Sequence, residues 1–293
     1  MVRAFYGFVL SAALVGCTYL PDLPDLPDLP LASDCKTAAP IGEFNPQTDV
    51  FVGHFDSKPD VDDLHTIAAV GSLLKQPEFS CVRAIGVAGA YGTQGGDYIE
   101  SPVLMQLAFG EDWLDGHNRR AGTVAQQAAL YVETLSEGGH VWIMIAGQAD
   151  IAADALAIAK NTSPDLPYTT HLHLVQHSDW NESVTAPAKL AQVQAGTDYR
   201  KIADGNATGN GTPGYTTNSG NRWADVLADR DIRAMWQEAK RLADLHNPTA
   251  AYVNPSVKEG GFDFSDTTEM AHVFGLNDLD NVDLFFDYVL DPA

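Results

Sequence analysis

Short apolar runs alternate with helical patterns of apolar residues along most of the chain. The first such unit has a strand over 50–52, of the kind buried on both faces, then a polar loop and a helix over 64–74. The same pattern predicts further strands over 82–87, 141–145 and 171–176, and helices over 101–110, 124–135, from 150 onward and over 223–246. Repeated strand–turn–helix units are typical of an α/β domain.

The loop of the first unit is strongly acidic, with Asp56, Asp60, Asp62 and Asp63 between the strand and the helix. Carboxylates gathered at the C-terminal end of a strand repel one another, so this turn needs either the N–H groups of a helix N-terminus or a bound cation. In open α/β sheets this is also the end at which ligands bind. The alternative is a solvated acidic helix cap, because Asp is favoured at that position.

Composition limits the partners that such a domain can have. With 293 residues and 45% hydrophobic content, the chain can form one large α/β domain. Its formal net charge of −22 argues against nucleic acid or anionic lipid as a partner of the folded domain.

The first residues resemble a bacterial lipoprotein signal. Arg3 precedes an apolar stretch that is too short to span a bilayer, and Leu14-Val15-Gly16-Cys17 matches a lipobox. We expect residues 1–16 to be removed and Cys17 to be lipidated, which anchors the protein to a membrane without spanning it. Thr18 after the cysteine indicates the outer membrane of a Gram-negative cell envelope.

Two further segments complete the predicted organisation. Residues 17–46 include the repeat PDLPDLPDLP and are predicted to form an extended, semi-rigid tether. Residues 47–293 are predicted to form the folded domain. Cys35 and Cys81 can pair in an oxidising compartment, or Cys81 can be a free buried thiol; the sequence leaves both open.

A polar and aromatic turn follows the strand over 171–176. His177, Asp179, Trp180 and Asn181 place an indole beside imidazole, carboxylate and amide groups, which is how sugar sites are built. Capping of the next helix by Asp179 or Asn181 is the alternative. Further along, residues 198–222 are rich in Gly and Asn and predict a long loop with three further candidate contacts, namely Asp204, Asn206 and Asn210.

Four segments of the chain resemble motifs of the nucleoside hydrolases, in the same order along the sequence. Asp56, Asp62 and Asp63 match three acids of the family's D-x-D-x-x-x-D-D loop, with Lys58 at its third position. In the family's V-A-G-N segment, Ala90 replaces the Asn. The segments around Asp150, His177 and Asp266 are most similar to the nucleoside hydrolase-like domain of a bacterial cellulose-binding lipoprotein family, and Ser265 replaces the His that precedes the last acid in nucleoside hydrolases.

The resemblance implies a nucleoside hydrolase-like α/β fold, with a mainly parallel central sheet flanked by helices. It also implies a metal site made of Asp56, Asp63, Asp266 and a backbone carbonyl near Asp150. Such an all-oxygen set suits Ca²⁺ rather than zinc. In this interpretation Asp62 is the general base of glycosidic hydrolysis, and His177 or Asp179 is a candidate for protonating the leaving group.

Two classes of function are therefore expected. The first is calcium-assisted hydrolysis of an N-ribosyl or related glycosidic bond, with substrate contacts from His177, Asp179, Trp180, Asn181 and Asn206. The second is a non-catalytic surface lipoprotein that keeps the fold and binds glycan, which the replacements Lys58, Ala90 and Ser265 favour. In both, the partner is a sugar, a nucleoside-like molecule or a polysaccharide fragment.

Overall fold

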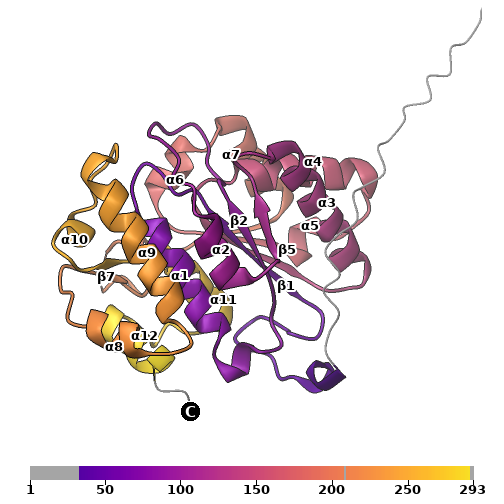
Figure 1. Ribbon diagram of the computed structural model, residues 1–293. Coiled ribbons are helices and arrows are strands. Elements are labelled where there is room, and N and C mark those ends of the chain that lie inside the picture. The colour runs from indigo at the N-terminus through magenta and orange to yellow at the C-terminus, as the bar shows by residue number, and fades with distance from the viewer. Residues whose placement is uncertain (1–32, 208, 291–293) are drawn as a thin grey trace, which may run out of the picture.

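The computed structural model describes residues 33–207 and 209–290 (Figure 1). The predicted signal peptide, Cys17 and the PDLPDLPDLP repeat lie outside the described residues.

A six-stranded sheet with only parallel pairings forms the centre of the molecule. Its strand order is β3-β2-β1-β4-β5-β6. Every residue of the central strands β1 and β4 is buried, which explains their unbroken apolar runs. The expected α/β class, with a parallel sheet between helices, is confirmed. The strands are β1 (Val50–Phe55), β2 (Arg83–Ala88), β3 (Trp113–Asp115), β4 (Val141–Ala146), β5 (Leu172–Gln176) and β6 (Asp198–Lys201).

Helices cover both faces of the sheet (Figure 1). Two separate apolar cores result: Phe51 and Phe55 of β1 belong to one core, and Val50 and Val52 to the other. The longer helices of the first core are α1 (Asp62–Leu74), α2 (Pro102–Phe109), α9 (Arg233–His246), α11 (Thr267–Phe274) and α12 (Val282–Leu290). The helices of the second core are α3 (Arg120–Ser136), α4 (Asp150–Thr162), α5 (Tyr168–His171) and α7 (Pro187–Gly196).

The remaining elements are short. A two-stranded antiparallel sheet pairs β7 (Thr216–Thr217) with β8 (Phe262–Asp263), so the predicted long loop over 198–222 has β6 at its start and β7 near its end. The other elements are α6 (Asp179–Val184), α8 (Trp223–Ala228), α10 (Pro255–Lys258) and the 3₁₀ turns η1 (Ser33–Thr37), η2 (Pro77–Phe79) and η3 (Asn247–Thr249).

The prediction of a single helix over 223–246 is wrong, because the structure has two helices there, α8 and α9. The carboxylate of Asp229 accepts hydrogen bonds from the backbone N–H groups of Asp231 and Ile232, at 2.8 and 3.0 Å. A local bond of this kind competes with helical pairing, so the chain turns between the two helices.

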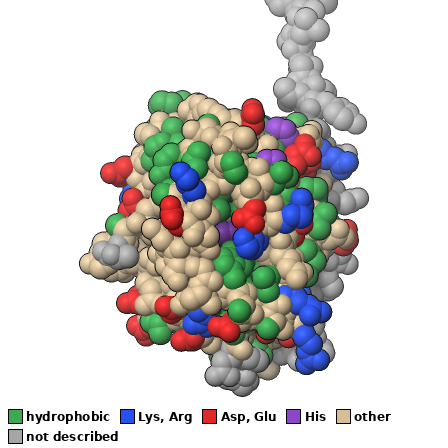
Figure 2. Space-filling model, turned by 60° about the vertical axis from the view of Figure 1, so that its left-hand side comes forward, with side chains coloured by type: hydrophobic (Ala, Val, Ile, Leu, Met, Phe, Trp, Pro, Cys, Tyr) green, Lys and Arg blue, Asp and Glu red, His purple; other side chains and the backbone are tan. Residues whose placement is uncertain are grey.

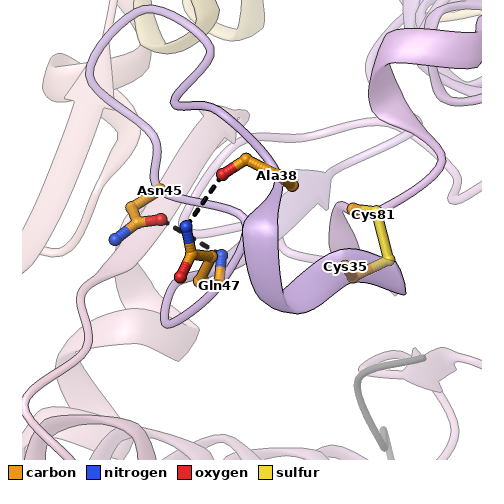
Figure 3. The surroundings of a disulfide bond; sticks show 5 residues. All are labelled: Cys35, Ala38, Asn45, Gln47 and Cys81. Carbon is orange, nitrogen blue, oxygen red and sulfur yellow. Dashed lines mark hydrogen bonds between the residues drawn. A yellow bond between two sulfur atoms is a disulfide. The ribbon is translucent and has the colours of Figure 1, made fainter. Parts of the chain in front are cut away.

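A disulfide joins η1 to the segment that precedes β2 (Figure 3). Cys35 and Cys81 are bonded with their Cα atoms 5.4 Å apart, so the structure contains the paired form of these two cysteines. Figure 3 also shows the Gln47 side chain donating to the carbonyl of Ala38, at 2.9 Å. These contacts hold the start of the described chain against the domain.

The sequence predicts a tether as far as residue 46, yet the structure places residues of its last part against the domain. Phe44 is fully buried, and its ring centroid lies 5.1 Å from that of Phe274 in α11. The backbone N–H of Glu43 donates to the carbonyl of Val273 at 3.1 Å. The packed part of the chain therefore begins before residue 47.

On the face of the molecule shown in Figure 2, acidic, basic and hydrophobic side chains are intermingled. No helix within the ranges 33–207 and 209–290 is long and apolar enough to cross a membrane.

Candidate functional site

The candidate site lies at the carboxyl end of the parallel sheet, between β1 and β4. The chain passes from β1 to β2 and β3 on one side, and to β4, β5 and β6 on the other, so this is the point where the strand order reverses. Ligands of open α/β sheets bind at such a point. A cavity of about 270 Å³ is present here, lined by Asp56, Lys58, Pro59, Asp60, Asp62, Ala146, His177, Ser178, Trp180, Asn181, Asn206, Tyr252 and Asp266.

The strand order is that of the doubly wound folds that bind dinucleotides. Those folds place a Gly-rich turn after the first strand, where backbone N–H groups approach the pyrophosphate. Here the acidic loop with Asp56, Asp60, Asp62 and Asp63 follows β1. Carboxylates repel phosphate, so this loop does not suit a dinucleotide.

Asp56 begins the acidic loop, and both of its carboxylate oxygens accept hydrogen bonds. Oδ1 accepts from the backbone N–H of Lys58, and Oδ2 accepts from the side-chain amides of Gln94 and Gln148, each at 3.0 Å. Burial is the largest cause that raises the pKa of Asp56 to about 8, and the nearby charge of Asp266 adds to it. The hydrogen bonds from Lys58 and Gln148 act in the opposite direction.

Asp63 in the first turn of α1 is fully buried. Its Oδ2 accepts from the backbone N–H of Ser57 at 2.6 Å, whereas its Oδ1 has no hydrogen-bond partner among the described residues. Burial and the charges of Asp56 and Asp266 raise the pKa of Asp63 well above its usual range. A buried carboxylate oxygen without a partner needs either a proton or a cation.

Asp60 and Asp62 form the other half of the acidic loop. Asp60 accepts a hydrogen bond from the side chain of Asn254 at 3.2 Å, and Asp62 accepts one from the backbone N–H of Asp63 at 2.8 Å. Burial raises the pKa of Asp60 to about 7. Burial and the charge of Asp60 raise the pKa of Asp62 well above its usual value.

His177 connects the end of β5 to the N-terminus of α11. Its Nε2 lies 2.5 Å from Oδ1 of Asp266, and the backbone N–H of Gly205 donates to its Nδ1 at 3.0 Å. Nε2 therefore carries the proton that is shared with Asp266. Burial lowers the pKa of His177, but the carboxylates of Asp204 and Asp266 outweigh burial and raise it.

Two aromatic side chains stand at the mouth of the cavity. Trp180 in α6 is 45% exposed, and Tyr252 in the loop before α10 is 55% exposed. Asn181 and Asn206 line the same cavity, and Asn206 accepts a hydrogen bond from the hydroxyl of Ser265 at 3.1 Å. Exposed aromatic faces beside amide groups suit the apolar faces and hydroxyl edges of a sugar ring.

Five of the residues predicted from the sequence do not line this cavity, namely Asp63, Asp150, Asp179, Asp204 and Asn210. The Asp179 carboxylate is exposed and forms an ion pair with Lys201, at 2.8 Å. Asp150 is buried at the start of α4, where its Oδ2 accepts from the backbone N–H of Ala186 at 3.3 Å. Asn210 is exposed and donates to the carbonyl of Asp204.

Some cavity residues were not selected from the sequence. Asp60 belongs to the acidic loop and could have been selected with its neighbours. Lys58, which departs from the motif that the acidic loop resembles, also lines the cavity. Tyr252 has no local motif around it. Its loop is fixed by Asn247 and Asn254, because the Asn247 side chain bonds both the N–H and the carbonyl of Asn254, at 2.7 and 3.0 Å.

The carboxylates at the cavity are candidate ligands of a cation. In the part of the chain that the structure describes, no group of three or more His, Cys, Asp or Glu side chains is already arranged around a metal position. The charge of Asp266 nevertheless contributes to the raised pKa of both Asp56 and Asp63, and Oδ1 of Asp63 is buried without a hydrogen-bond partner among the described residues. Carboxylate oxygens of this kind fit a hard cation such as Ca²⁺ in their chemistry.

Comparison with known proteins gave no match: no family model, no curated protein and no solved structure matches the chain.

Proposed function

We propose that the protein is an exported, lipid-anchored hydrolase of a glycosidic bond, N-ribosyl or related, that uses Ca²⁺. The observation that carries this proposal is the composition of one cavity at the switch point of the sheet. Four carboxyl groups, of Asp56, Asp60, Asp62 and Asp266, share it with the exposed indole of Trp180. Acid–base groups and a sugar-binding surface are thus present in one place.

The cavity side chains divide into binding and chemical roles. The ring of Trp180 packs against the sugar ring, and the amides of Asn181 and Asn206 fix its hydroxyl groups. Asp62, whose pKa is raised by burial and by Asp60, accepts a proton from the water that attacks the anomeric carbon.

Asp56, Asp63 and Asp266 would hold Ca²⁺, which when bound orients sugar hydroxyls and lowers the pKa of water. Two residues were candidates for protonating the leaving group. His177 lines the cavity, whereas Asp179 faces Lys201 outside it. In this arrangement the Nε2 proton of His177 is directed at Asp266 and Nδ1 accepts from Gly205, so His177 orients the Asp266 carboxylate rather than protonating a leaving group.

A second candidate function is glycan binding without turnover. One observation favours it: Ser265 occupies the position of the His in the resembling motif, and its hydroxyl donates to Asn206. A serine hydroxyl is too weak an acid to protonate a leaving group near neutral pH. In that case the cavity would bind sugar and release it unchanged.

The variant Asp62→Asn distinguishes these two functions. If the protein is a hydrolase, the wild type releases reducing sugar or free base from some member of a panel of nucleosides and oligosaccharides. Asp62→Asn then still binds that compound but loses about 10²- to 10⁴-fold in turnover. Asp179→Asn is the matched control, because Asp179 is an exposed Asp outside the cavity, and it should retain turnover. Binding without turnover by the wild type would establish the binding module instead.

A further inference from the structure

We propose that Lys58 selects a sugar that carries a carboxylate, such as a uronic acid. This inference rests on the proposed function, in that the cavity must take a sugar. It adds the substrate class and names the side chain that recognises it.

Lys58 is a basic residue that lines an otherwise acidic cavity without pairing with a carboxylate of the described residues. It lines the cavity together with Asp60 and Asp62. Within the described residues, however, its Nζ forms no ion pair with any Asp or Glu oxygen at 4.0 Å or less. Lysines at other half-buried positions, such as Lys189 and Lys201, do form ion pairs at 2.6 Å. The charge of Lys58 is therefore available to a ligand.

Two neighbours hold the Lys58 ammonium group without neutralising it. Nζ donates to the carbonyl of Gln94 at 3.2 Å and lies 4.1 Å from the centroid of the Tyr91 ring. Gln94 is itself fixed, since its side chain bonds Asp56 and the backbone N–H of Gly92. An ammonium group has three N–H donors. One is donated to Gln94, and the described residues supply no acceptor for the other two.

The other groups of the cavity define the rest of that ligand. The carboxylates of Asp60 and Asp62 accept hydrogen bonds, so they suit sugar hydroxyls, and the indole of Trp180 suits the face of the ring. These carboxylates repel a negatively charged ligand, and the repulsion grows with the number of negative charges on the ligand. A singly charged carboxylate placed at Lys58 therefore fits better than a doubly charged phosphate.

The test measures the affinity of the full chain, in the presence of Ca²⁺, for two matched pairs: glucuronic acid with glucose, and galacturonic acid with galactose. The members of each pair differ only at C6, where a carboxylate replaces a hydroxymethyl group, so their ratio of Kd values measures the preference for the carboxylate. A charge-assisted contact should favour the acid by roughly 10- to 100-fold. Lys58→Met should remove this preference and leave the affinity for the neutral sugar unchanged, whereas Lys58→Arg should keep it.

Lys75→Met is the matched control, because Lys75 is exposed at the far end of α1 from the cavity. The inference is overturned if acid and neutral sugar bind equally, or if Lys58→Met keeps the preference while its melting temperature shows that it is folded. Both outcomes leave the proposed hydrolysis standing when Asp62→Asn still abolishes turnover. If no member of either pair binds, the inference fails, and the Asp62 assay on nucleosides decides the proposed function separately.

Discussion

Nε2 of His177 lies 2.5 Å from Oδ1 of Asp266, although 89 residues separate them in the chain. The backbone N–H of His177 also donates to Glu269 in α11, at 2.8 Å. The end of β5 and the first turn of α11 are thus joined twice, and this places Asp266 at the cavity beside the acidic loop that follows β1. The loop after β1 and the start of α11 therefore both supply carboxyl groups to the cavity.

Calcium should stabilise the folded protein through these carboxylates. A ligand that binds only the native state, present at about 100 times its Kd, adds about 2.7 kcal/mol to the free energy of unfolding. For a domain of this size that corresponds to a rise in melting temperature of roughly 5–10 °C. Differential scanning calorimetry with Ca²⁺ and then with a chelator measures the shift.

The variant Asp63→Asn should remove most of this calcium shift, because Asp63 supplies the buried oxygen that has no other partner. Asp179→Asn should keep the full shift. An unchanged melting temperature of the wild type in excess Ca²⁺ would rule out the metal site.

The Asp60 carboxyl group should make the calcium-free protein less stable as the pH rises from 4 to 7. Burial raises the pKa of Asp60 from 3.8 to about 7, so the folded state binds more protons than the unfolded chain between these values. The free energy of unfolding therefore decreases from pH 4 to pH 7 for this group, and its contribution is fully lost above pH 7. Denaturant titrations at several pH values in a chelator measure the slope.

Other buried groups act in the opposite direction, so the Asp60 contribution must be isolated. Burial lowers the pKa of His54 to about 4 and that of His65 to about 3, which costs stability as the pH falls below 6.5. The variant Asp60→Asn retains both histidines and removes the carboxyl group. Its stability should decline less than that of the wild type between pH 4 and pH 7; equal slopes would contradict the assignment.

The disulfide should contribute substantially to stability. It links residues 46 positions apart, and closing a loop of that length restricts the unfolded chain. Reduction, or the variant Cys35→Ser, should lower the free energy of unfolding by about 2–4 kcal/mol. Cys35→Ser should then be insensitive to reductant. If reductant leaves the melting temperature of the wild type unchanged, the disulfide does not stabilise the fold.

The sequence predicted the elements of the sheet because they depend on local patterns. The run of apolar residues in β1 and the helical spacing in α1 required no distant contact, and the acidic loop between them was visible for the same reason. The break between α8 and α9 was missed because it depends on one side chain, Asp229, bonding the backbone ahead of it.

The direction of each side chain could not be predicted in the same way. Ser178 adopts a positive φ of 68°, and its hydroxyl oxygen accepts from the backbone N–H of Trp180 at 3.1 Å. In this turn Trp180 lines the cavity, whereas its neighbour Asp179 pairs with Lys201 outside it. Tyr252 reaches the cavity because its N–H donates to the carbonyl of Pro59, at 3.2 Å, a contact between segments far apart in the sequence.

Trp180 and Tyr252 should both contribute to sugar binding, because each presents an exposed aromatic surface at the mouth of the cavity. Replacing either by Ala should weaken binding by about 0.5–1.5 kcal/mol, roughly a two- to tenfold rise in Kd, with little change in melting temperature. The conservative variants Trp180→Phe and Tyr252→Phe should retain most of the affinity. Leu245→Ala is the control, since Leu245 is 60% exposed and lies outside the cavity lining.

The double variant shows whether the two rings contact the same part of the ligand. If both pack on one sugar ring, their effects are not additive, because losing the first ring allows the sugar to move away from the second. If they contact different sugar units, the effects add for an oligosaccharide, and only one of them remains for a monosaccharide. Calorimetric titration of the four proteins with a sugar and its oligomer measures this. Affinities that do not change in any variant would show that the ligand does not bind at this mouth, and the sugar-binding proposal would fail there.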